Sequence, residues 1–290
     1  MLNFGKGKVK IAGVQFAGLQ GEKSRNIAVA ERMIRDAAAQ GAQIVITPEV
    51  ALTGFVGGER ERPLAEPIPG ATAERFRRLA QELGVYLLIG MSELADGEIR
   101  NAMPVFSPHG EMMGVMRKVH INKWETGDGW RNGSAFPVWD FKTPTGQFRG
   151  GIAICYDVEV PESTRILMLE EVDVIFNPMA AAAPSAMTNI RRGLLRTRAF
   201  ENEVFLFMVN HAAPRHNGHS MVFDYEGNIV REMDEKEGVF VQELDLDALN
   251  KYRATGYYGF HHRRPELYEI LSNPLGQIHP ANANLPPSDK

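Results

Sequence analysis

The only cysteine of the chain stands where an α/β protein can place a nucleophile. Cys155 ends a predicted buried strand, Gly151–Cys155, and a helix is expected to begin near Pro161. Open α/β sheets place their sites at the carboxyl ends of strands, and a nearby helix N-terminus would favour a thiolate. Free cysteine is also among the most buried residue types, so Cys155 taken alone is better explained as a core residue.

Two charged residues, Glu49 and Lys118, also follow predicted strands. Glu49 comes after the apolar run Ile44–Thr47 and could act as a general base if desolvation raises its pKa toward neutrality. Lys118 ends the strand Met112–Arg117, and its ammonium could stabilise an oxyanion or keep a carboxylate and a thiolate ionised. Either charge alone is more simply a solvated loop residue. A base, a cation and a nucleophile that follow three different strands favour one shared active site.

The segments around these residues resemble the nitrilase superfamily, the carbon–nitrogen hydrolases, over nearly the whole chain. Each motif is modestly specific, but three motifs in the family's order are a strong signal. They are Pro48–Phe55 (PEVALTGF), Arg117–Ile121 (RKVHI) and Gly151–Glu162 (GIAICYDVEVPE), with similar blocks at Gly13–Gln15, Arg196–Asn202, Gly218–Met221 and Arg263–Tyr268.

The resemblance implies an α/β fold, a four-layer α-β-β-α sandwich with mixed sheets. It also implies a homodimer or larger homo-oligomer, no cofactor, and catalysis by Glu49, Lys118 and Cys155. A second glutamate often assists in the loop after the lysine. Glu125 is the nearest candidate for this role, and Asp128 is the alternative.

These residues predict hydrolysis of a small amide through a thioester. The Cys155 thiolate would attack the carbonyl carbon, while Lys118 and a backbone N–H near Tyr156 stabilise the oxyanion. Glu49 would take the thiol proton and return it to the leaving nitrogen. Ammonia or an amine would leave, and water activated by Glu49 would then release the carboxylic acid.

The residues after the cysteine favour the amidase-type branch. Tyr156 and Glu159 among them are candidate substrate contacts. Nitrile-cleaving members usually carry Trp-Glu after their cysteine, whereas this chain has Tyr156-Asp157. Members that cleave N-carbamoyl amino acids can place arginines where this chain has Val158 and Glu159. If Glu159 faces the site, it disfavours an anionic substrate; it could instead lie in the first turn of the next helix.

Three alternatives to a small-amide hydrolase stay open. The chain could be an N-carbamoyl amino acid amidohydrolase or a nitrilase. It could also be a catalytically silent binding or scaffold subunit. Loss of one of the three catalytic residues would mark such a subunit, and none is lost.

Helices and strands that alternate along the chain must position the site. This alternation predicts a layered α/β protein rather than a barrel. Helices are expected from Ser24 or Asn26 as a cap, after Thr72, from Pro161 and from Thr188. A hairpin is expected around Ser107–Gly110. The remaining predicted strands are 9–15, 44–47, 85–89, 174–176, 204–209, 220–224, 229–233 and 239–244.

Composition predicts one domain, residues 1–271, because 290 residues with 44% hydrophobic content can bury a full core. Residues 272–290 hold four of the 17 prolines and are expected to form an extended C-terminal arm or a disordered tail. A net charge of −4 without long charged runs gives no reason to expect nucleic acid or a membrane as partner.

The cysteine and histidine content bears on redox state and metals. One cysteine cannot form an internal disulfide, which suggests the reducing cytoplasm. The close histidine pairs lack the i, i+4 spacing of a zinc-binding helix, so no metal is expected.

Overall fold

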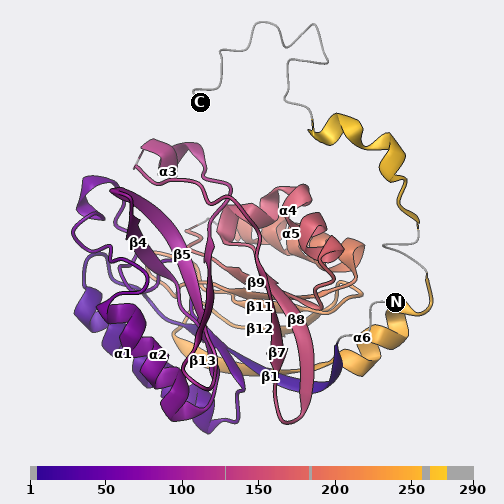
Figure 1. The fold of residues 1–290 in the computed structure, drawn as a ribbon, viewed down its shortest axis with the longest axis horizontal. Coiled ribbons are helices and arrows are strands. Elements are labelled where there is room, and N and C mark those ends of the chain that lie inside the picture. The colour runs from indigo at the N-terminus through magenta and orange to yellow at the C-terminus, as the bar shows by residue number, and fades with distance from the viewer. Residues whose placement is uncertain (1–4, 128, 183–184, 257–261, 273–290) are drawn as a thin grey trace, which may run out of the picture.

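A computed structural model describes residues 5–127, 129–182, 185–256 and 262–272 (Figure 1). Thirteen strands form a mixed sheet that β1 divides into two layers. The strands are β1 Lys6–Gln15, β2 Ile44–Ile46, β3 Tyr86–Leu88, β4 Met91–Ala95, β5 Glu98–Phe106, β6 Met112–Arg117, β7 Val138–Lys142, β8 Gly146–Ile152, β9 Val174–Pro178, β10 Phe205–Val209, β11 Met221–Phe223, β12 Ile229–Glu232 and β13 Gly238–Asp245. The α-helices are α1 Lys23–Ala39, α2 Ala71–Leu83, α3 Lys123–Gly127, α4 Pro161–Leu169, α5 Ser185–Asn202 and α6 Leu246–Arg253. Short 3-10 helices span Gly58–Arg60, Cys155–Glu159, Pro265–Leu267 and Glu269–Ser272.

The first layer has the order β13-β1-β2-β3-β5, with β4 and β6 also paired to β5. β1, β2 and β3 run parallel, and α1 and α2 connect them. This arrangement confirms the strand–helix–strand units expected from the sequence. The predicted hairpin is also present as β5 and β6, which pair antiparallel.

The second layer has the order β7-β8-β9-β10-β11-β12 and contains the cysteine segment. β8, β9 and β10 run parallel, and α4 and α5 connect them. The start of β1 joins this layer, because Lys6 pairs with Gln147 of β8. The three candidate residues therefore follow β2 and β6 of the first layer and β8 of the second layer.

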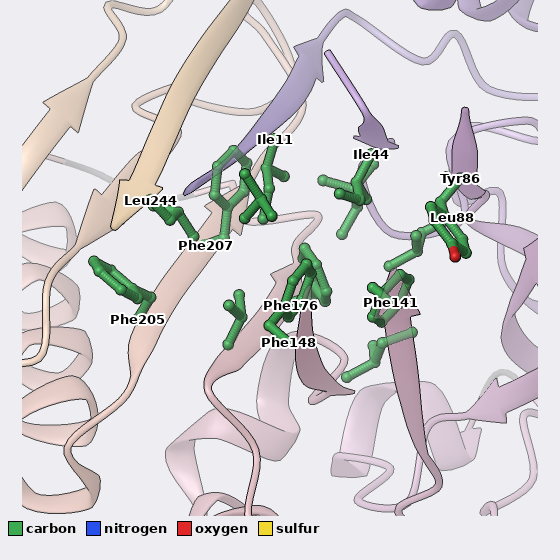
Figure 2. Close-up of a cluster of buried hydrophobic side chains, with 14 of the residues drawn as sticks. Ile11, Ile44, Tyr86, Leu88, Phe141, Phe148, Phe176, Phe205, Phe207 and Leu244 are labelled. Atoms are coloured by element: carbon green, nitrogen blue, oxygen red, sulfur yellow. The ribbon is translucent and has the colours of Figure 1, made fainter. Parts of the chain in front are cut away.

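The main hydrophobic core lies between the two sheet layers (Figure 2). Ile44 and Leu88 of the first layer meet Phe148 and Phe176 of the second layer in this cluster. Val45, which is adjacent to Ile44, belongs instead to the cluster that packs against α1 and α2. Adjacent strand residues face opposite sides of a sheet, so both faces of these strands are buried. With α4 and α5 packed on the other layer, the result is an α-β-β-α sandwich.

The strand predicted to end at Cys155 is shorter than expected, and that prediction was wrong at its end. β8 ends at Ile152, and Cys155 begins a 3-10 helix. The reason is a competing side-chain bond: a carboxylate oxygen of Asp157 accepts the N–H of Ile154 at 3.0 Å. This local bond turns the chain out of the sheet.

The predicted helix caps were also wrong. No side-chain hydrogen bond caps the start of α1, and Asn26 lies inside the helix, where its Nδ2 donates to Leu19 O at 2.7 Å. Thr72 lies inside α2, and its hydroxyl donates to Glu66 at 2.6 Å. Both polar side chains bond to neighbouring loops rather than to the helix ends.

The C-terminal arm predicted for 272–290 falls almost wholly outside the described residues. Before it, the 3-10 helices Pro265–Leu267 and Glu269–Ser272 expose Leu267, Ile270 and Leu271. Within the described ranges, no helix is both long enough and apolar enough to cross a membrane.

Candidate active site

The three residues singled out from the sequence meet in one buried cluster together with Glu125. Lys118 Nζ donates to Glu49 Oε1 at 2.8 Å and to Glu125 Oε1 at 2.5 Å. All three side chains are at most 3% exposed. Cys155 is partly exposed and interacts electrostatically with each of them. Residues from both sheet layers therefore build one site, with Glu125 included as the resemblance implied.

Besides Lys118, two partners from distant segments hold Glu49. Asn101 Nδ2 on β5 donates to the same Oε1 at 2.7 Å, and His211 Nε2 lies 2.7 Å from the Glu49 carbonyl oxygen. The N–H of Gly18 donates to His211 Nδ1, so the ring carries its proton on Nε2 and donates it to Glu49. Burial lowers the pKa of His211, which keeps the ring neutral.

One oxygen of Glu49 remains available for proton transfer. Oε2 is buried without a hydrogen-bond partner among the described residues. An interaction with the Glu49 side chain is also among the causes that raise the pKa of the Cys155 thiol. Glu49 is therefore placed to accept the thiol proton.

Lys118 remains a cation although it is fully buried. Burial alone would lower the pKa of its ammonium, but Glu49, Cys155 and Glu125 together raise it. Burial raises the pKa of Glu125, and Lys118 opposes that shift. A buried charge is tolerated when it is paired in this way. The site thus holds a fixed positive charge beside the thiol.

Cys155 sits on a strained turn. Its φ of +48° lies in the left-handed region, which non-glycine residues rarely adopt, and Val50 after Glu49 has a φ of +45°. Such strain costs about 1 to 3 kcal/mol per residue and is concentrated at functional sites. The strain thus marks the two segments that carry Glu49 and Cys155.

The surroundings of Cys155 favour a neutral thiol, whereas the sequence led us to expect a thiolate. Burial and the nearby carboxylates Glu49 and Glu125 raise the pKa of the thiol, while Lys118 acts in the opposite direction. A role of Cys155 as nucleophile would therefore require a base to remove the proton of the thiol.

Asp157 connects the cysteine turn to the segment after Lys118. Its Oδ2 accepts from Ile154 N, and its Oδ1 accepts from His120 N at 2.7 Å and contacts His120 Nδ1 at 3.0 Å. One buried carboxylate thus joins two segments that each carry a site residue. From the sequence, Asp157 was only an indicator of substrate class, and this positioning role was missed.

The two candidate substrate contacts differ in exposure. Tyr156 is partly exposed and lies in the first turn of the 3-10 helix, where backbone N–H groups lack helical partners. Glu159 ends that helix and is exposed, and its carbonyl oxygen accepts from Arg198 Nη2 at 3.2 Å. Asp128, the alternative to Glu125, lies outside the described residues.

Other residues at the strand ends were missed, although the same reasoning would have found them. Asn177 near the end of β9 donates to the carbonyl oxygens of Ala153 at 2.6 Å and Cys155 at 3.5 Å. His211 follows β10. Both are polar residues at the ends of apolar strands, which is the pattern that identified Glu49. In the described part of the chain, no group of three or more His, Cys, Asp or Glu residues is arranged to hold a metal ion.

Gly90 gives Glu49 the space it needs, so Gly90→Ala should lower activity. A Cβ at Gly90 would lie 2.0 Å from the Pro48 carbonyl oxygen, which forces the Pro48–Glu49 backbone to move. A displacement near 1 Å costs on the order of 100-fold in rate. We expect kcat to fall by about that factor. Gly193→Ala on α5, where nothing lies within 4 Å, is the matched control, and equal losses in both variants would contradict the argument.

A stacked histidine pair beneath Glu49 should make stability depend on pH. His216 is 5% exposed and stacks on His211 with ring centroids 4.6 Å apart. Burial, together with His211 and Arg215, lowers the pKa of His216 to about 3. As pH falls, His216 takes up a proton in the unfolded chain, where its pKa is near 6.5, before it does so in the folded chain. The contribution of His216 to the free energy of unfolding is therefore complete above about pH 6.5 and is lost as pH falls toward 3.

Unfolding in urea at pH 7 and pH 4.5 measures this effect. About two pH units of this interval lie below pH 6.5, which corresponds to a loss of about 2 to 3 kcal/mol in the free energy of unfolding. His216→Gln cannot titrate, so the loss of stability between the two pH values should be smaller in this variant by about that amount. An equal loss in wild type and variant would contradict the assignment.

Known proteins of one hydrolase family are similar to this chain in sequence and in structure. Residues 10–254 match the family model described as carbon-nitrogen hydrolase. The N-carbamoylputrescine amidase of Arabidopsis thaliana is 30% identical over 93% of this chain and 97% of its own length. The structure of Saccharomyces cerevisiae Nit3, a member of branch 10 of the nitrilase superfamily, superposes with a TM-score of 0.76 at 25% identity, covering 86% of this chain and 94% of that chain.

A third similar protein is an amidase from Nesterenkonia sp. AN1. A mutant of that amidase has a TM-score of 0.71 to this chain at 23% identity, covering 86% of this chain and 95% of its own. Its structure shows covalent addition of the acetamide moiety of fluoroacetamide at its active-site cysteine.

Proposed function

We propose that this chain, which belongs to the carbon–nitrogen hydrolase family, hydrolyses a small linear amide to a carboxylic acid and ammonia. The observation that carries this proposal is the buried Glu49–Lys118–Glu125 cluster beside Cys155. It contains a base, a fixed cation and a nucleophile, which are the groups that acyl transfer requires. Its relatives include amidases and also a nitrilase, so the preference for an amide over a nitrile rests on Tyr156-Asp157 after the cysteine.

In the proposed first step, Glu49 takes the proton of the Cys155 thiol as Sγ attacks the carbonyl carbon. The C=O π pair moves to oxygen, and Lys118 with the N–H of Tyr156 stabilises the resulting oxyanion. Glu49 then gives its proton to the amide nitrogen, and the C–N bond breaks. Ammonia leaves, and a thioester remains on Cys155.

In the second step, water attacks the thioester. Glu49 takes a proton from the water, the C–S bond breaks, and the proton returns to sulfur. The carboxylic acid leaves and the thiol is restored. Glu125 does not transfer protons in this scheme; it shares the Lys118 ammonium with Glu49 and holds it in place.

A panel of substrates tests the proposed class. Ammonia release should be fastest with linear amides, slower with N-carbamoyl amino acids and slowest with nitriles. A clear preference for carbamoyl amino acids or nitriles would replace this proposal with the corresponding alternative. If the folded wild-type protein turns over no class of substrate in the panel, the alternative of a binding subunit would be favoured.

We also propose that the chain forms a homodimer or larger homo-oligomer and works in the cytoplasm, where its single catalytic thiol stays reduced. Ile166, Leu169 and Ile190 on α4 and α5 are 43%, 44% and 62% exposed, and apolar side chains gathered on a surface favour association. Light scattering should give a mass of at least twice 32.3 kDa. A monomer at micromolar concentration would contradict the assembly.

A further inference from the structure

Asn101 on β5 contacts both the segment that carries Lys118 and the side chain of Glu49. Its backbone carbonyl oxygen accepts the N–H of Lys118 at 2.9 Å. Its side-chain Nδ2 donates to Glu49 Oε1 at 2.7 Å. Asn101 and Glu49 are each 1% exposed, so the bond between them is shielded from water. One residue of β5 therefore links the buried cation to the buried carboxylate.

Folding stability alone does not explain an asparagine at this position. Only the NH₂ group of the amide can donate to a carboxylate, so Nδ2 rather than Oδ1 is turned toward Glu49. Oδ1 is left buried without a hydrogen-bond partner among the described residues. A buried oxygen without a partner costs free energy, and an apolar residue at position 101 would avoid that cost. The bond to Glu49 is therefore the feature of Asn101 that needs a functional explanation.

The bond from Asn101 makes the two carboxylate oxygens of Glu49 unequal. Oε1 accepts from Lys118 Nζ at 2.8 Å as well as from Asn101 Nδ2. Oε2 is buried and has no partner within the described ranges. A hydrogen bond donated to a carboxylate favours its ionised form, and two donors on one oxygen leave the other oxygen to take up a proton. Glu49 thus has one anchored oxygen and one oxygen open to the Cys155 thiol, which interacts with its side chain.

We propose that Asn101 is a positioning residue that acts through Glu49: it anchors Oε1, keeps the carboxylate ionised and leaves Oε2 as the oxygen that accepts the thiol proton. The inference rests on the proposed function, in which Glu49 is the base. The other ionisable groups that face the Glu49 side chain are Lys118 after β6, Glu125 of α3 and the Cys155 thiol. They stay in place when only Asn101 is changed, so a change at Asn101 isolates the effect of its amide.

Two variants separate the donor of Asn101 from its shape. Asn101→Leu removes the donor at similar volume, whereas Asn101→Asp keeps the shape and replaces the donor with a second carboxylate. We expect Asn101→Leu to lower kcat on the best amide by roughly 10- to 100-fold, the range for a lost hydrogen bond to a charged group. Asn101→Asp should lose at least as much, because two carboxylates would then face each other. A role in packing alone predicts the reverse order, and that order would overturn the proposal.

The pH dependence of Cys155 alkylation by iodoacetamide reports on Glu49 directly. In this reaction Sγ displaces iodide, and the thiol proton passes to Glu49. In Asn101→Leu the acidic limb of the rate profile should move to higher pH by about one unit, because the ionised carboxylate has lost a donor. Asn202→Leu on α5 is the matched control, since Asn202 is equally buried, donates to Arg198 O at 2.8 Å and also has an unpartnered Oδ1 among the described residues. It should keep the wild-type limb, and equal shifts in both variants would overturn the proposal.

A double-mutant cycle with Glu49→Gln shows whether Asn101 acts through Glu49. Adding Asn101→Leu to Glu49→Gln should not slow alkylation further, because the base is already lost. A further loss as large as the one in the wild-type background would overturn the proposal. Alkylation needs no turnover, so a shifted limb and a non-additive cycle support the role of Asn101 even if no amide is hydrolysed. A wild-type profile in Asn101→Leu would overturn that role even if amide hydrolysis is confirmed.

Discussion

Replacing Cys155 by alanine should reduce kcat by roughly 10⁴- to 10⁶-fold, the range seen when an enzyme loses its nucleophile. The expectation follows from the site, where Lys118 and Glu49 are positioned for acyl transfer but neither can form the thioester. Ammonia release from the best amide measures the loss. The folded state should be retained, because alanine is smaller and apolar and Cys155 is partly exposed.

Cys155→Ser gives a sharper version of this experiment. The hydroxyl keeps a proton for Glu49 to accept but is a poorer nucleophile than sulfur, so this variant should also be severely impaired. Intact-mass spectrometry of the wild type, quenched during turnover, should show the acyl group on Cys155 and none on either variant. Wild-type turnover by Cys155→Ala would refute the mechanism.

Replacing Glu49 by glutamine should lower kcat by roughly 10²- to 10⁴-fold, the usual contribution of a general base. Glutamine keeps the shape of the side chain but cannot accept the thiol proton. The loss should be large here because the environment of Cys155 raises the pKa of the thiol, so little thiolate forms without a base. Lys118 keeps Glu125 as its second carboxylate partner.

Alkylation by iodoacetamide distinguishes loss of the base from loss of the fold. At pH 7, Glu49→Gln should react more slowly than the wild type, and the difference should shrink as rising pH ionises the thiol directly. Glu66→Gln is the control, since Glu66 is a hydrogen-bonded carboxylate that pairs with Lys23 away from the site. Equal alkylation rates for the wild type and Glu49→Gln at pH 7 would show that Glu49 is not the base.

The sequence determined the central part of the site because of a simple topological rule. Strands in parallel units end at the same edge of their sheet, so residues that follow such strands are brought together. Glu49 and Cys155 each lie three residues beyond the ends of the parallel strands β2 and β8, and Lys118 directly follows β6 of the β5–β6 hairpin. Apolar runs are visible in the sequence, and so are the polar residues that end them.

The partners that hold these residues in place were decided by tertiary structure. Asn101 reaches Glu49 from 52 positions away, and His211 reaches the same residue from 162 positions away. Such contacts depend on which strands are neighbours and how the two sheet layers pack. Hydrophobic periodicity does not contain that information.

The protonation state of the nucleophile was also beyond the sequence. A helix N-terminus near Cys155 predicted a thiolate, but burial and two carboxylates from distant segments raise the pKa of the thiol. Burial is a property of the packed molecule, and the sum of nearby charges depends on distances in three dimensions.

The sequence alone therefore singled out three residues, Glu49, Lys118 and Cys155, that the fold brings into one cluster. Only the tertiary structure decided the rest: that Cys155 lies on a strained turn after β8, and that burial and two carboxylates raise the pKa of its thiol. The physical reason is that strand ends follow from local patterns of apolar residues. The ionisation, burial and orientation of the side chains at the site follow from packing between elements that are far apart in the chain.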